Sequence, residues 1–182
     1  MIIIEGADGT GKTTLGQALV AELLGQYFHC SYQKHWDIYN YHRTILEAAG
    51  KLETGANITC IIDRWAISEA VYGTHFRKEP SYPWRDLMNY ALKQFNPTII
   101  YCRTKDTVER HQDLNYRRME MYDNIEGIPE LYDDFIIGNK CYVYDFTKTS
   151  LEQAVKEIAE YERHGKHEHN SRCICTTSEV WV

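Results

Sequence analysis

The eight residues from Gly6 to Thr13, which read Gly-Ala-Asp-Gly-Thr-Gly-Lys-Thr, constrain the fold of this chain more than any other feature. They match the pattern G-x-x-x-x-G-K-[ST], a loop between a strand and a helix whose backbone N–H groups surround a polyphosphate. An apolar run, Ile2–Glu5, precedes the motif, and a segment with helical periodicity, Thr13–Leu24, follows it. A glycine-rich turn that binds nothing is the alternative, and the complete motif in this context disfavours it. The sequence therefore predicts a strand, a phosphate-binding loop and a helix in succession.

The parts of the loop have separate expected roles. Gly6, Gly9 and Gly11 permit the backbone conformations that turn successive N–H groups inward. Lys12 is expected to reach the β- and γ-phosphates, and the hydroxyl of Thr13 to ligate Mg²⁺. We therefore expect ATP and Mg²⁺ as ligands, with an ATP-binding set of Gly6, Ala7, Asp8, Gly9, Thr10, Gly11, Lys12, Thr13 and Thr14.

Short apolar runs alternate with helix-length segments along the chain. Buried strands are expected at Ile2–Glu5, Ile58–Asp63, Thr98–Arg103 and Cys141–Phe146, with a more polar fifth candidate at Phe28–His35. Helices are expected at Thr13–Leu24, Tyr39–Leu52, Ala66–Tyr72, Trp84–Phe95, Thr107–Leu114 and Ser150–Arg163, the last opened by a Ser-x-x-Gln capping box. This alternation predicts an α/β fold, a three-layer α/β/α sandwich on a five-stranded parallel sheet, with ligands at the carboxyl ends of the strands.

The length and charge of the chain limit what it can bind. Its 182 residues fit one domain, which we expect at residues 1–163, with residues 164–182 as a loosely ordered extension. Lys and Arg total 20 against 26 Asp and Glu, and the net charge of −6 disfavours a nucleic-acid partner. We find no stretch with the length of a membrane span and no signal-peptide core, so we expect a cytoplasmic protein without a membrane partner.

Cysteine and histidine usage gives weaker indications. Cys60, Cys102 and Cys141 lie in apolar runs, which is typical of buried free thiols and not of a disulfide framework. The C-terminal segment gathers potential metal ligands, but their spacing matches no familiar zinc motif, and a disordered tail is favoured over a zinc site. These residues are His164, His167, His169, Cys173 and Cys175.

A second polar site is expected where the strand Ile58–Asp63 ends. An acidic residue in the place of Asp63, beside a phosphate loop, is the usual second partner of Mg²⁺. Arg64 follows directly and can hold a second phosphate through two hydrogen bonds. The alternative is an internal ion pair between Asp63 and Arg64. The sequence thus predicts Thr13 and Asp63 as metal ligands and Arg64 as a phosphate anchor.

Two stretches of the chain resemble the thymidylate kinases. The segment from Glu5 to Thr14 is similar to the phosphate loop of that family, in which an acidic residue stands in the place of Asp8. The pattern Asp63-Arg64-Trp65-x-x-Ser68-x-x-x-x-Tyr72-Gly73 is similar to the family's Asp-Arg-Tyr-x-x-Ser element, and with Glu69, Tyr72 and Arg77 it most resembles the compact phage-type members. The resemblance covers most of residues 1–163 and implies a P-loop kinase of (deoxy)nucleoside monophosphates, commonly a homodimer.

The resemblance also implies roles for acceptor-site residues. Asp8 would contact the 3′-hydroxyl of the acceptor sugar, Arg64 would hold the acceptor phosphate, and Ser68 and Glu69 would lie near the base. The aromatic residue and the arginine that usually read thymine do not align, and the candidates in that short segment are as consistent with ordinary packing. The base is therefore open, and the full acceptor-binding set is Asp8, Arg64, Ser68, Glu69, Tyr72, Arg77 and Arg43, with Tyr39 and Tyr41 as further candidates for stacking.

An arginine-rich segment follows the strand that ends near Arg103. Phosphoryl transfer builds negative charge on the transferred group, and cations on a closing lid stabilise that charge. We expect a lid at about residues 104–119 with Arg110, Arg117 and Arg118 as catalytic candidates, a placement that the resemblance also implies. A solvated mixed-charge helix is the alternative, because acidic residues alternate with the basic ones. The loop from Asp145 to Thr149 is expected to border adenine.

Together these features favour transfer of the γ-phosphate of ATP to a deoxynucleoside monophosphate, dTMP or a related nucleotide, without a covalent enzyme intermediate. The catalytic residues would be Lys12, Arg64, Arg110, Arg117 and Arg118. A deoxynucleoside kinase is the runner-up, and it would need a carboxylate such as Glu5 or Asp63 near the acceptor hydroxyl. A nucleotide-dependent switch is disfavoured, because the chain has no Asn-Lys-x-Asp element and an arginine-rich lid suits transfer better.

Overall fold

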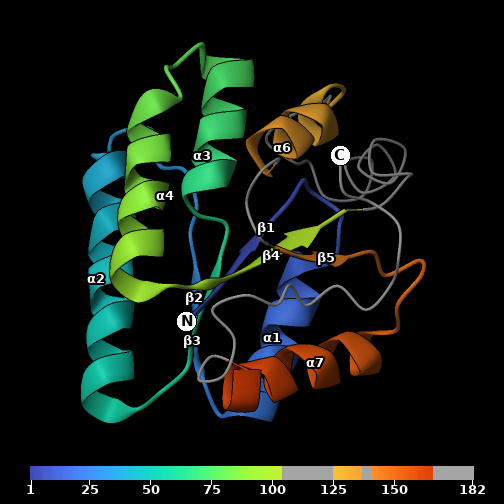
Figure 1. Ribbon diagram of the computed structural model, residues 1–182. Helices are drawn as coiled ribbons and strands as arrows, with labels where there is room; N and C mark the ends of the chain where they lie inside the picture. Colours follow the sequence, from blue (N-terminus) through green and yellow to red (C-terminus); the bar gives the residue numbers. More distant parts are fainter. Residues whose placement is uncertain (104–124, 137–140, 166–182) are drawn as a thin grey trace.

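The computed structural model describes residues 1–103, 125–136 and 141–165, which form a five-stranded parallel sheet covered by helices on both faces (Figure 1). The strands are β1 (Ile2–Glu5), β2 (Gln26–His29), β3 (Cys60–Asp63), β4 (Thr98–Cys102) and β5 (Tyr142–Tyr144), in the spatial order β2-β3-β1-β4-β5. This arrangement confirms the expected α/β/α sandwich. Because β1 is the central strand, the loop that follows it lies at the middle of the sheet's carboxyl edge.

Helices fill the two outer layers. They are α1 (Lys12–Leu23), α2 (Ile38–Ala56), α3 (Ala66–Tyr72), η1 (Gly73–Arg77), α4 (Tyr82–Phe95), α6 (Ile128–Ile136), α7 (Leu151–Glu160) and η2 (Tyr161–Gly165). In Figure 1, α2, α3 and α4 stand together on one side of the sheet, and α1 and α7 lie on the other. Among the described residues no helix has the length and apolar character needed to cross a membrane.

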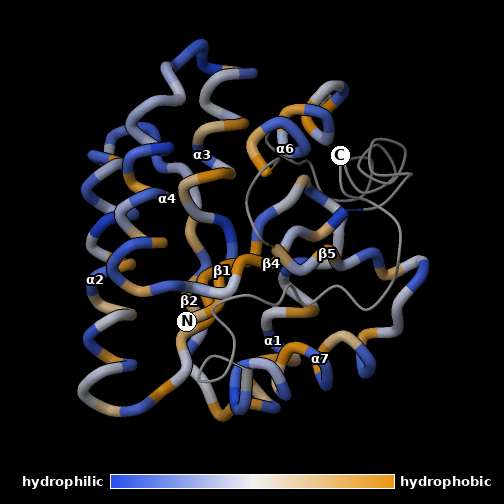
Figure 2. The backbone as a smooth tube through the Cα atoms, in the orientation of Figure 1, coloured by the Kyte–Doolittle hydropathy of each residue, from blue (hydrophilic) through white to orange (hydrophobic). Residues whose placement is uncertain are grey.

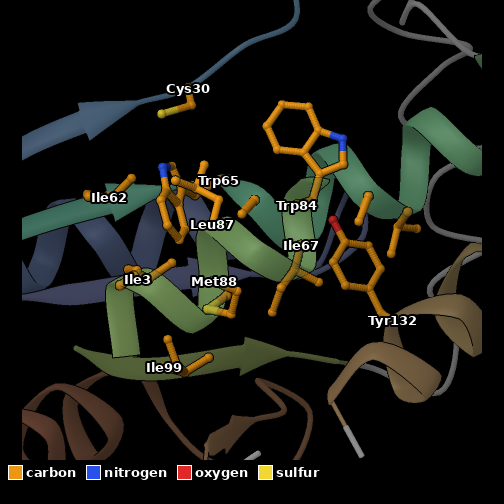
Figure 3. Packing of buried hydrophobic residues seen from close by; sticks show 14 of the residues in the cluster. Ile3, Cys30, Ile62, Trp65, Ile67, Trp84, Leu87, Met88, Ile99 and Tyr132 are labelled. Atoms are coloured by element: carbon orange, nitrogen blue, oxygen red, sulfur yellow. The ribbon is translucent and has the colours of Figure 1, made fainter. Parts of the chain in front are cut away.

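Each strand sends alternate side chains to opposite faces, and this alternation divides the core in two. Ile3 packs with residues of α2, α3, α4 and α6, whereas Ile2 and Ile4 pack with residues of α1 and α7. Figure 3 shows the first cluster, in which Trp65 and Met88 lie close to Ile3. The hydropathy colouring of Figure 2 follows the same pattern, with apolar segments concentrated along the strands. Burial on both faces explains why the strands are apolar throughout.

Several element boundaries differ from the sequence expectations. Strand β2 covers Gln26–His29 and not Phe28–His35, because Gln26 N–H already donates to the carbonyl of Thr59 and the pairing with β3 ends at Cys30. The helix α6 had no counterpart in the sequence prediction, and α3 continues directly into the π-helical turn η1. The expected helix Thr107–Leu114 lies outside the described residues.

Two local predictions are confirmed with a change of detail. Helix α1 ends at Leu23, but its left-handed residue is Leu24 (φ 50°) and not Gly25, which instead lies close to the backbone of Thr59. Ser150 caps α7 by accepting a hydrogen bond from the N–H of Gln153 at 3.2 Å, while the Gln153 side chain donates to Glu157. Among the described residues no cysteine forms a disulfide; Cys30, Cys60 and Cys102 are buried and Cys141 is half-buried.

Candidate nucleotide-binding site

The phosphate loop has the backbone geometry that its sequence predicts. Gly6, Gly9 and Gly11 have φ values of 142°, 78° and 84°, a region that residues with a Cβ rarely adopt. At Gly6 a Cβ atom would also lie 2.3 Å from the carbonyl oxygen of Cys102 on β4. Helix α1 begins at Lys12, so its positive end faces the loop. The loop is therefore built to surround an anion.

Lys12 is nearly buried, and its Nζ donates to the carbonyl of Ala7 at 2.5 Å. The hydroxyl of Thr10 donates to the same carbonyl at 2.7 Å. The two bonds hold the Lys12 and Thr10 side chains against the backbone of the loop. Phosphate oxygens would offer Lys12 a stronger, charge-assisted partner in the same place.

Asp63 lies at the end of β3 and collects three neighbouring donors on one oxygen. Its Oδ2 accepts from the hydroxyls of Thr13 at 2.9 Å and Tyr27 at 2.5 Å, and lies 3.3 Å from Nδ1 of His29. Burial alone would raise the pKa of this carboxyl, but the hydrogen bond from His29, the charge of Lys12 and the two hydroxyls together lower it. Asp63 is therefore held as a carboxylate.

The other oxygen of Asp63, Oδ1, is buried and has no hydrogen-bond partner. An unpartnered carboxylate oxygen beside the Thr13 hydroxyl fits a Mg²⁺ ion, which prefers oxygen ligands. Within the described ranges there is no cluster of three His, Cys, Asp or Glu residues that could hold a metal. One carboxylate and one hydroxyl fit an ion that takes its remaining ligands from phosphate and water.

Arg64 occupies a strained position immediately after β3. Its φ is 62°, which is uncommon for a residue with a side chain, and its N–H donates to the carbonyl of Ile4 at 3.0 Å. The guanidinium forms an ion pair with Asp8 of the phosphate loop and lies 5.9 Å from the ring centre of Tyr72. The carboxylate partner of Arg64 is thus Asp8 and not Asp63. The Tyr72 hydroxyl accepts from the N–H of Asp8 at 3.2 Å, so these three residues stand together at the loop.

A buried series of hydrogen bonds holds the start of α3 against the end of β1. Glu5 is fully buried and accepts bonds from the N–H groups of Trp65, Ile67 and Ser68, each at 3.1 Å, and from the Ser68 hydroxyl at 2.5 Å. The Ser68 hydroxyl also lies 2.7 Å from that of Tyr132 on α6. Burial raises the pKa of Glu5 to about 7 despite these bonds. Ser68, expected near the acceptor base, is only 4% exposed, and its hydroxyl is engaged in the hydrogen bonds with Glu5 and Tyr132.

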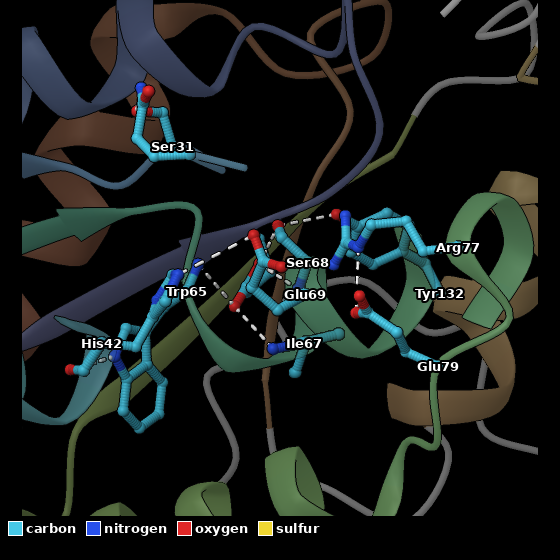
Figure 4. Close-up of polar contacts among 11 residues, drawn as sticks. Ser31, His42, Trp65, Ile67, Ser68, Glu69, Arg77, Glu79 and Tyr132 are labelled. Carbon is cyan, nitrogen blue, oxygen red and sulfur yellow. Dashed lines mark hydrogen bonds and ion pairs between the residues drawn. The ribbon is translucent and has the colours of Figure 1, made fainter. Parts of the chain in front are cut away.

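Glu69 and Arg77 form a second ion pair at 2.6 Å, and Arg77 also contacts Glu79 at 2.9 Å (Figure 4). The Arg77 guanidinium lies 4.1 Å from the ring centre of Tyr32, in the segment between β2 and α2. His42 of α2 lies on the other side of Glu69, with Nε2 at 3.8 Å from Oε1. Glu69 belongs to α3, which begins two residues after Arg64, so this group of residues lies next to the Arg64 site.

The remaining acceptor-site candidates contact aromatic side chains. The guanidinium of Arg43 stands 5.9 Å from the ring centre of Tyr90 on α4, so the structure does not bring it to Arg64. Tyr39 packs against Trp84, and Tyr41 against Trp36. The lid arginines Arg110, Arg117 and Arg118 and the ligand-rich tail from His167 to Cys175 lie outside the described residues.

Sequence reasoning missed four polar residues of this region. Tyr27 and His29 contact Asp63, Tyr132 contacts Ser68, and His42 lies beside Glu69. Tyr27 and His29 were missed because the predicted strand Phe28–His35 placed them at its amino end, whereas the observed β2 ends at His29. His42 and Tyr132 come from helices whose packing could not be read from one chain.

Comparison with solved structures gives the same fold. The YorR protein from Bacillus subtilis, solved in complex with phosphorylated GDP, superposes with a TM-score of 0.68 at 23% identity, covering 93% of this chain and 99% of the other. Deoxyadenosine kinase from M. mycoides, solved with the products dCMP and dCDP, superposes with a TM-score of 0.51 at 15% identity, covering 89% and 98%. No protein-family model and no curated protein sequence matches the chain.

The fold, the phosphate loop and the neighbours define the class: this chain has the P-loop kinase fold. Likeness at such low identity establishes the architecture, and the activity has to be argued from the site.

Proposed function

We propose that this chain transfers the γ-phosphate of ATP to a deoxynucleoside monophosphate, such as dTMP or a related nucleotide. The observation that carries the proposal is the position of Arg64, a partly exposed guanidinium paired with Asp8 of the phosphate loop itself. A second phosphate held by Arg64 would lie beside the triphosphate bound at residues 6–14. Close approach of donor and acceptor is the main requirement of phosphoryl transfer.

The carboxylates of the site favour a monophosphate over a nucleoside acceptor. A nucleoside hydroxyl benefits from a nearby general base, whereas a phosphate acceptor is already ionised. Both oxygens of Glu5 accept hydrogen bonds at the start of α3, and Asp63 has the surroundings of a metal ligand. Neither supports a role as base, and Asp8 is ion-paired with Arg64, which a nucleoside without a phosphate would not displace. A deoxynucleoside kinase is therefore the second candidate. The neighbours fit either acceptor, because they were solved with phosphorylated GDP and with dCMP and dCDP.

In the proposed mechanism the loop N–H groups and Lys12 hold the β- and γ-phosphates, and the break of the Lys12 bond to Ala7 accompanies binding. Thr13 and Asp63 would hold Mg²⁺, which supplies positive charge to the phosphate oxygens when bound. Arg64 would exchange Asp8 for the acceptor phosphate, which leaves Asp8 to accept from the sugar hydroxyl. Arg110, Arg117 and Arg118 remain proposals for the lid, as does a homodimer for the assembly.

The test is coupled ADP release from ATP·Mg²⁺ with a panel of deoxynucleoside monophosphates and the matching nucleosides. Lys12→Ala should reduce turnover by about a thousandfold, because it removes a charge that acts on the transferring group. Lys93→Ala, an exposed lysine of α4, is the matched control and should leave turnover unchanged.

Turnover of monophosphates that is lost in Lys12→Ala would establish the activity. Turnover of nucleosides alone would favour the deoxynucleoside kinase. No turnover across the panel, with ATP still bound, would contradict both and favour a switch or a macromolecular substrate.

A further inference from the structure

A buried polar cluster beside the acceptor site contains more hydrogen-bonding capacity than the protein itself uses. Its members are Glu69, 6% exposed, Arg77 and His42, 1% exposed (Figure 4). Both ring nitrogens of His42 are buried and have no hydrogen-bond partner. A buried imidazole without partners is costly for a folded protein, and each such group calls for an explanation.

The charge states of the cluster are set by its surroundings. Burial, assisted by the nearby positive charge of Arg77, lowers the pKa of His42 to about 4. His42 is thus neutral near pH 7, with one ring nitrogen as donor and the other as acceptor. Glu69 is ion-paired with Arg77 through Oε2 at 2.6 Å, whereas Oε1 lies 3.8 Å from the His42 ring, beyond hydrogen-bond distance. Oε1 is therefore an acceptor with capacity to spare.

Aromatic rings already surround the cluster. The ring of Tyr32 lies 4.1 Å from the Arg77 guanidinium and interacts with its charge through the face of the ring. His42 contacts Trp84 and Tyr41 edge to face, at 5.5 and 5.3 Å between ring centres, and its carbonyl accepts from the indole N–H of Trp65 at 2.9 Å. These contacts fix the position of His42 without using its ring nitrogens.

We propose that Glu69, Arg77 and His42 read the acceptor base and select keto bases, thymine and guanine, over the amino bases cytosine and adenine. This inference rests on the proposed function for the placement of the acceptor. A keto base carries a ring N–H beside a carbonyl, whereas an amino base carries a bare ring nitrogen beside an NH₂ group. Burial raises the pKa of Glu69, and its ion pair with Arg77 opposes that rise. In the ionised form that the ion pair favours, Glu69 accepts the ring N–H and donates nothing. His42 or Arg77 donates to the adjacent carbonyl.

The mismatch with an amino base is the source of the selectivity. With the ring nitrogen held at Glu69 and the exocyclic group at His42 or Arg77, an amino base would place its bare ring nitrogen against the Glu69 carboxylate with no proton between them, which leaves two buried acceptors unpaired. Sites that depend on a buried polar match reject such analogues far more strongly than apolar pockets reject a change of size. The turn η1 positions Arg77 in this cluster, because Gly73 leaves room for the Arg77 side chain. A Cβ at residue 73 would lie 2.9 Å from Nη2 of Arg77.

The experiment measures kcat/KM for dTMP, dGMP, dCMP and dAMP, and equilibrium binding of the same four nucleotides by calorimetry. The wild type should prefer the two keto nucleotides by about tenfold or more in both measurements. Glu69→Gln, whose amide can both donate and accept, should bring the four nucleotides to within about threefold. Glu79→Gln is the matched control, because it removes the other carboxylate on Arg77 and should keep the preference.

Equal or better use of amino bases by the wild type would overturn the inference, and so would equal effects of the two glutamine variants. The wild-type ratio requires no mutant to fold and decides the question alone. If the nucleotides bind with a keto preference but are not phosphorylated, the proposed function fails and the inference stands. If they are phosphorylated without that preference, the inference fails and the proposed function stands.

Discussion

Glu5 connects the phosphate loop to the acceptor site. Four donors from the start of α3 converge on its carboxyl, which therefore fixes where Arg64 and Tyr72 lie relative to the loop. The site needs an acceptor at this point, and a carboxyl offers enough lone pairs for all four bonds. Complete burial disfavours its charged form, so ionising Glu5 in the folded protein costs stability, and this cost depends on pH.

The first prediction concerns that cost. Burial raises the pKa of Glu5 from 4.5 to about 7, so the folded state binds a proton more tightly than the unfolded chain. The contribution of Glu5 to stability is therefore complete below pH 4.5 and is lost as the pH rises through about 7. Glu5→Gln cannot titrate, and its free energy of unfolding relative to wild type should rise by about 3 kcal/mol between pH 4.5 and pH 8.

Urea unfolding of wild type and Glu5→Gln at four pH values measures this difference. Loss of a well-matched acceptor lowers the stability of the variant at every pH, so the test is the slope and not the offset. A pH-independent difference would show that Glu5 titrates normally in the folded protein.

The second prediction tests the guanidinium of Arg64. A lysine at this place keeps the positive charge but cannot make two parallel hydrogen bonds to a phosphate. Arg64→Lys should raise KM for the acceptor nucleotide by about tenfold and change KM for ATP by less than about twofold. The control is Arg85→Lys on α4, whose guanidinium stands over Phe135. Equal rises in both KM values would indicate a general disturbance of the site.

At the level of elements, local patterns predicted most of the fold. Helix α3 has the expected bounds, and four of the five strands lie within their predicted ranges, because buried parallel strands are apolar throughout. The exception, β2, is an edge strand with half-exposed residues, so its pattern is weak. Helix α6 was missed although Ile128, Tyr132 and Ile136 lie on its buried face, because short amphipathic helices are hard to separate from loops in a single sequence.

The third prediction compares two glycines of α2. At Gly50 a Cβ would lie 2.3 Å from the Phe95 ring of α4, so Gly50→Ala should separate the helices and destabilise the protein by about 1–3 kcal/mol. At Gly55 nothing lies within 4 Å, and Gly55→Ala should stabilise by up to about 1 kcal/mol through helix propensity. Thermal unfolding should therefore show melting temperatures displaced in opposite directions. Equal displacements would contradict the close packing of α2 on α4.

At the level of the whole molecule, strand order assembles the site. β3 and β4 flank β1, so Asp63 and Arg64 after β3 arrive next to the loop after β1. Strand–helix alternation together with the loop motif was enough to predict this meeting. The partners of each side chain were not predictable in the same way. The pairing of Arg64 with Asp8, and the position of His42 beside Glu69, depend on side-chain packing between elements far apart in the sequence.

The last prediction concerns where the folded unit ends. The sequence placed this end at residue 163, and η2 continues to Gly165. Within η2, Arg163 bonds to the Glu22 carboxylate at 2.7 Å and Glu162 accepts from the Thr98 hydroxyl, which ties η2 to α1 and β4. We expect residues 1–165 to retain the melting temperature and turnover of the full chain. Residues 1–160 lose both contacts, about 2 kcal/mol in all, and should melt about 4–8 °C lower.

Differential scanning calorimetry of the three chain lengths measures this, and added Zn²⁺ tests the ligand-rich tail in the same series. If the tail held a structural zinc, Zn²⁺ would raise the melting temperature of the full chain but not that of residues 1–165. If residues 1–165 melt below the full chain without zinc, the tail packs on the domain and the folded unit is longer than proposed. Because η2 bonds to both α1 and β4, we expect the large drop in melting temperature to lie between the chain that ends at residue 165 and the one that ends at residue 160.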